Sequence, residues 1–152
     1  MSLAERRANQ IDESLAKQTL ERQWILEGKA ASRAGAPLLW DALADAIREE
    51  VEVFSSRVQR AATMSAQLSG NSLSVQTTIF PLVQLHINRL ELGVNTRWMI
   101  QKYSLGTAKE SKWSVYRFAA DCNREPCFSD GDAELSPQSL AEKLLEPIFD
   151  IF

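Results

Sequence analysis

Residues 70–79 read GNSLSVQTTI, and this stretch decides the fold because the spacing of apolar side chains changes there. Before it, apolar residues recur every three or four positions, as they do on one face of a helix. From Leu73 onward they alternate with polar residues, which is typical of a half-buried strand. The change predicts helices in the first half of the chain and an antiparallel sheet in the second. It indicates architecture far more strongly than activity.

The segment before this change predicts a core helix that begins near Pro37, a residue suited to the first helical position. Its apolar residues keep to three- and four-residue steps and so share one face: Trp40, Leu43, Ile47, Val51, Phe54, Val58 and Ala61. Gly28 and Gly35 bracket a run of small residues, which we expect to end an earlier helix. The sequence therefore predicts two N-terminal helices.

The earlier helix, from Leu3 to about Arg33, has only a thin apolar stripe. Gln18 and Arg22 stand where a coiled-coil seam would continue, which argues against a long zipper. A helix this polar needs a partner surface, because helical propensity alone stabilises it little. We expect residues 1–36 to form a protruding or oligomerising helix and residues 37–152 a compact α+β domain. The expected contact stripe consists of Ile11, Leu15, Leu20, Trp24 and Ile25.

Alternation after residue 72 predicts four to five antiparallel strands, one of them short. The first covers residues 73–79, and the others cover 82–92, 97–105, 112–120 and 127–128, with a turn at 93–95. Ser136 and Pro137 then mark the start of a C-terminal helix. The predicted fold is α+β in a two-layer arrangement, with two N-terminal helices, the antiparallel sheet and the C-terminal helix.

Composition excludes several classes of protein. The chain has 152 residues and a net charge of −3, which gives no general reason to expect nucleic acid as a partner. No apolar run reaches the length of a membrane span, and no apolar segment follows the first arginines as in a secretory signal. We expect a cytoplasmic protein whose thiols are reduced, although a disulfide between Cys122 and Cys127 is an open geometric alternative.

Chemical motifs are sparse. Cys122 and Cys127 are only half of a typical zinc site, and residues 121–132 have the spacing of a calcium loop with Pro126 where glycine is required. The common local signatures of nucleotide binding and hydrolysis do not occur. We therefore expect no metal, no cofactor and no catalytic residue, and the sequence favours a non-enzymatic protein.

Charge is unevenly distributed in the second half. Residues 97–124 hold six basic and two acidic residues (+4), and residues 125–152 hold one basic and seven acidic residues (−6). Aromatic residues are interleaved with the basic ones. This segment either faces solvent or packs against the acidic end of the chain.

These patterns support three hypotheses. The first is a protein–protein interaction module that forms a homodimer or binds a larger protein through the N-terminal stripe. The second is a small-molecule-binding domain whose pocket is lined by His86, Trp98, Trp113 and Tyr116. The third and weakest is binding of single-stranded nucleic acid by the basic, aromatic strands, with Lys102 and Arg117 as test positions.

Overall fold

The computed structural model describes residues 2–152, apart from the side chains of residues 25, 27, 28, 31 and 32. Its elements follow the order α1 (Leu3–Arg57), η1 (Gln59–Ala61), β1 (Ser65–Ser69), β2 (Ser72–Gln76), β3 (Leu82–Arg89), β4 (Gly93–Gln101), β5 (Lys109–Glu110), β6 (Ser114–Ala120), β7 (Pro126–Ser129), β8 (Glu134–Leu135) and α2 (Pro137–Phe149). The strands form one antiparallel sheet, ordered β1-β2-β3-β4-β6-β7-β8, with β5 paired to β4. The predicted α+β class is confirmed, and the sheet has more strands than the four to five expected.

Two helical elements precede the sheet, but the boundary between them differs from the predicted one. Helix α1 continues through Pro37, and η1 follows only after Val58. Gly35 does not end the helix. It lies against Pro126 of β7 so closely that a Cβ at this position would collide with the proline ring. The glycine therefore serves close packing between helix and sheet, which a sequence pattern cannot distinguish from a helix stop.

Turn chemistry also corrects two sequence predictions. Gly70, with a φ of +59°, stands with Asn71 in the hairpin turn between β1 and β2, so strand structure begins before the predicted first strand. The turn between β3 and β4 lies at residues 90–92 instead of the predicted 93–95. Gly93 belongs to β4, where a side chain would collide with the backbone carbonyl of Tyr116 in β6.

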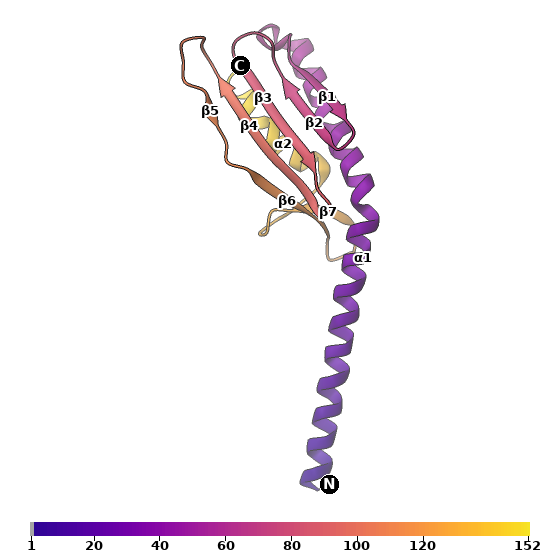
Figure 1. Cartoon of the computed structure of the whole chain (residues 1–152). Helices are drawn as coiled ribbons and strands as arrows, with labels where there is room; N and C mark the ends of the chain where they lie inside the picture. The colour runs from indigo at the N-terminus through magenta and orange to yellow at the C-terminus, as the bar shows by residue number, and fades with distance from the viewer. Residues whose placement is uncertain (1) are drawn as a thin grey trace.

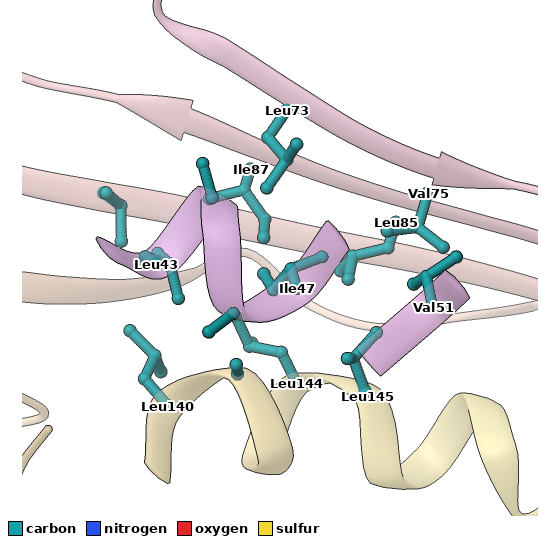
Figure 2. Packing of buried hydrophobic residues seen from close by; sticks show 14 of the residues in the cluster. Leu43, Ile47, Val51, Leu73, Val75, Leu85, Ile87, Leu140, Leu144 and Leu145 are labelled. Carbon is teal, nitrogen blue, oxygen red and sulfur yellow. The ribbon is translucent and has the colours of Figure 1, made fainter. Parts of the chain in front are cut away.

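The core forms where the C-terminal part of α1 lies between the sheet and α2 (Figure 2). Leu43, Ile47 and Val51 are almost completely buried, as the sequence predicted. On the sheet side they face the buried side chains of β2 and β3, namely Leu73, Val75, Leu85 and Ile87. On the other side they face Leu140, Leu144 and Leu145 of α2. Burial of each large side chain contributes roughly 1.5–3 kcal/mol, so this cluster dominates the stability of the body.

Both ends of the helical layer are fixed by specific contacts. The ring of Phe54 in α1 stacks on Phe149 at a centroid distance of 3.9 Å, and Phe152 packs edge-on against it at 5.7 Å. Ser136 caps α2 by accepting a hydrogen bond from the backbone N–H of Ser139.

Within residues 2–152, no helix combines the length and apolar character needed to cross a bilayer.

Candidate functional site

The N-terminal part of α1 runs away from the sheet and ends far from the body (Figure 1). Residues 2–24 are exposed throughout, and among the residues of α1 whose burial is described the first buried ones are Gly35 and Ala36. At a rise of 1.5 Å per residue, the segment from residue 3 to residue 23 is roughly 30 Å long. Its first turn is held by a capping box, in which Ser2 Oγ accepts from the N–H of Glu5 and Glu5 Oε2 accepts from the N–H of Ser2.

The protruding segment of residues 3–23, here called the free segment, repeats the spacing of the core face. Ala4, Ala8, Ile11 and Leu15, here called the seam, each lie 36 residues before a buried core residue: Trp40, Ala44, Ile47 and Val51. Because 36 residues make about ten helical turns, each pair lies on the same side of α1. The seam is thus a continuation of the core face beyond the body. Ile11 and Leu15 within it are 60% and 56% exposed.

The predicted contact stripe divides between two faces of the helix. Trp24 is nine residues after Leu15, about two and a half turns, and so lies on the opposite side. Leu20 is one turn before Trp24 and shares its face. The side chain of Ile25 lies outside the described part of the structure. Only Ile11 and Leu15 among the predicted residues therefore belong to the seam.

Trp24 instead marks the joint between the free segment and the body. The guanidinium of Arg124 lies 3.8 Å from the centroid of the Trp24 ring, and Arg124 Nη1 donates to the Trp24 carbonyl oxygen at 3.5 Å. Arg124 has a φ of 60°, which is uncommon for a residue other than glycine. The turn is held by Asp121, whose Oδ1 accepts from the N–H groups of Asn123 and Glu125 at 2.8 and 2.9 Å. Sequence reasoning missed this joint, because its partners are 100 residues apart.

The four residues predicted to line a pocket do not share a face of the sheet. Trp98 on β4 packs against the core, and Tyr116 on β6 is buried there. His86 on β3 is exposed on the opposite face, directly across from Arg97. Trp113 is exposed beside the guanidinium of Arg97, 5.6 Å from its ring centroid. Because the sheet separates these two pairs, the arrangement gives no support to one pocket lined by all four.

The basic segment of residues 97–124 mostly faces solvent and its own strands. Arg97 Nη2 pairs with Glu110 Oε1 at 3.2 Å, and the ammonium of Lys109 lies 5.9 Å from the Trp98 ring centroid. The acidic segment supplies its own partner for Lys143, whose Nζ lies 3.2 Å from Asp130 Oδ2. Hydrogen bonds from the backbone N–H groups of Ala133 and Asp132, followed by Lys143, lower the pKa of Asp130 to about 2.

The two cysteines are free thiols. Cys122 is exposed, whereas Cys127 is buried in β7, and burial raises the pKa of its thiol, with smaller effects from Glu134 and Asp121. Among the residues whose positions are described, no group of three or more histidine, cysteine or acidic side chains is arranged to hold a metal ion.

Comparison of the chain with family models, with curated proteins and with solved structures found no match. Its function therefore has to follow from its own residues. The most distinctive of these form the seam, an uncovered continuation of the core face.

Proposed function

We propose that the chain is a non-enzymatic interaction module that associates with a second copy of itself through the seam. The single observation that carries this proposal is the 36-residue correspondence between the exposed seam and the buried core face. The same pattern of side chains that packs against β2, β3 and α2 in the body is presented to solvent along the free segment. An isolated helical segment is only marginally stable, so a partner that covers the seam would stabilise it.

Association through the seam is expected to be weak. Each copy contributes Ile11 and Leu15, which are 60% and 56% exposed in the monomer, so the burial of four such side chains would give a gross gain of roughly 3.5–7 kcal/mol. The loss of translational and rotational freedom costs about 4–15 kcal/mol. The two ranges overlap, so we expect a dimer whose population depends on protein concentration. We also propose a cytoplasmic location, because Cys122 and Cys127 are both free thiols, as is usual for proteins of a reducing compartment.

The experiment is sedimentation of the whole chain between about 10 and about 200 µM, a range that detects micromolar association. The test variant is Ile11→Gln combined with Leu15→Gln, since glutamine keeps helical propensity while removing the apolar contact. Leu20→Gln is the matched control on the opposite face of the same segment. Leu105→Gln, at a fully exposed position of the body, is the second control.

We expect the average mass of the wild-type chain and of both controls to rise with concentration, and that of the seam variant to stay monomeric. A monomeric wild type across the whole range would disprove the proposal. Loss of association in the Leu20→Gln chain would assign the interface to the other face, and would equally disprove the seam. Circular dichroism checks that each variant retains its helix.

A further inference from the structure

A cleft of about 660 Å³ opens where α1 leaves the body. Its walls come from three distant parts of the chain: one face of α1 between residues 29 and 37, the connection between β3 and β4, and residues 117–120 of β6. This volume is within the range of small-molecule sites in proteins. The cleft is separate from the seam, which ends about four turns earlier along the helix.

The charge of the cleft is opposite to that of the chain. Among the described residues that line it, Lys29 and Arg33 of α1, Arg89 of β3 and Arg117 of β6 stand against one acidic residue, Glu91, which gives four minus one, or +3. The whole chain has a net charge of −3. None of these four basic side chains forms an ion pair with another described side chain. With four basic residues against Glu91, the described lining carries an excess of positive charge, which an anion in the cleft would neutralise.

Apolar groups line the rest of the cleft. Phe118 is buried against it, Ala36 and Pro37 form part of the helical wall, and Leu92 is exposed at the rim. Guanidinium groups present their N–H donors in a fork that matches the oxygens of phosphate and carboxylate groups. We propose that this cleft binds a small organic oxyanion, in which an apolar body lies against Phe118 and Leu92 and a phosphate or carboxylate group is held by Arg33 and Arg89.

The main competing occupant is a second copy of the chain, because the edge of α2 carries Glu142 and Glu146 beside Glu50 of α1. A concave site with three separate walls suits a small molecule better than a helix edge, since small ligands are bound in clefts that surround most of their surface. The two occupants differ in a measurable way: only the second copy would fill the cleft as protein concentration rises without ligand.

The test is a titration of the whole chain followed by the backbone amide signals of Leu92, Ala119 and Ala120 in heteronuclear NMR spectra. Phenyl phosphate and benzoate are the probes that carry both an apolar ring and an oxyanion. Inorganic phosphate and benzyl alcohol each lack one of the two parts. Arg33→Gln combined with Arg89→Gln is the test variant, and Arg48→Gln, an exposed arginine elsewhere on α1, is the control.

We expect saturable shifts at these amides with phenyl phosphate or benzoate, with a dissociation constant in the region of about 1 mM or tighter. The double variant should weaken binding about tenfold or more, as expected when two charge-assisted contacts are lost, and Arg48→Gln should leave it unchanged. Stronger binding of phenyl phosphate than of benzoate would identify the group as phosphate, and the reverse as carboxylate.

Three results would overturn the inference. The first is the absence of saturable shifts up to about 10 mM of either probe, and the second is equal affinity in the double variant. The third is a change in the same signals on concentrating the protein alone, which would identify a second copy as the occupant. Each result can be separated from failure of the seam, because the seam is tested by mass and the cleft by ligand-induced shifts.

Discussion

Replacement of two isoleucines on the same face of α1, Ile11→Ala and Ile47→Ala, separates core from interface within one helix. Ile47 is 0% exposed between the sheet and α2, so its truncation removes buried methyl groups and leaves a cavity. Such a change costs about 2–5 kcal/mol. For a chain of this size, each kcal/mol shifts the melting temperature by about 2–4 °C, so we expect a decrease of about 4–20 °C.

Ile11 lies on the same face of α1 as Ile47, but its side chain is 60% exposed in the monomer. Less than half of its transfer free energy is available to lose, and alanine has the higher helix propensity, by a few tenths of a kcal/mol. The two effects nearly cancel, so we expect a change in monomer stability within about 0.5 kcal/mol. In the dimer the same substitution removes a buried contact from each copy.

Urea unfolding at about 1 µM and about 100 µM protein measures both effects, because association makes apparent stability depend on concentration. At the lower concentration the Ile11→Ala and wild-type chains should unfold at the same midpoint, and Ile47→Ala at a clearly lower one. At the higher concentration only chains with an intact seam should gain stability. A cost for Ile11→Ala as large as that for Ile47→Ala at low concentration would refute the reasoning, since the seam would then be packed within the monomer.

Three further outcomes follow from the body of the protein. Gly35→Ala should destabilise the chain by about 1–3 kcal/mol in urea unfolding, because the new methyl group meets the ring of Pro126, whereas a glycine-to-alanine change in an unobstructed helix would stabilise it. Asp130, whose folded pKa of about 2 is below its unfolded value of about 3.9, should contribute stability above pH 4 that is lost as the pH falls towards 2. The unfolding free energies of the wild-type and Asp130→Asn chains should therefore differ at pH 6 and converge near pH 2. A thiol reagent at neutral pH should modify Cys122 quickly and Cys127 only on unfolding, since burial also raises the pKa of the Cys127 thiol, and equal rates measured by mass spectrometry would contradict this.

The sequence predicted the fold class and the core helix because both depend on local periodicity. Leu43, Ile47 and Val51 could be placed on one face from their spacing alone, and the capped start of α2 followed from Ser136 and Pro137. The boundaries that it missed depend on close contacts between distant segments. Gly93 starts β4 because of the Tyr116 carbonyl in β6, and no pattern near residue 93 records that neighbour.

The candidate sites were harder to predict, because they are assembled from parts of the chain that lie far apart in sequence. Arg89 and Arg117 line the same cleft as Lys29 and Arg33 only after the sheet forms and α1 leaves it. A sequence signal does exist for the helical half of the cleft, since Lys29 and Arg33 are four residues apart on the extended core face, where apolar residues would otherwise continue. The sheet half has no comparable signal.

The 36-residue correspondence explains why periodicity alone cannot tell the core face of α1 from an interface. Ile11 and Ile47 are equivalent by spacing, and they differ only in what the rest of the chain brings to cover them. In the part of α1 whose burial is described, buried residues begin at Gly35, because the absence of a side chain there lets Pro126 of β7 lie against the helix. The Trp24–Arg124 contact, about three turns earlier, is the outermost link between the helix and the loop before β7. These two contacts fix where the body ends along α1, and so they determine that the same apolar pattern is core on one side of the joint and an exposed seam on the other.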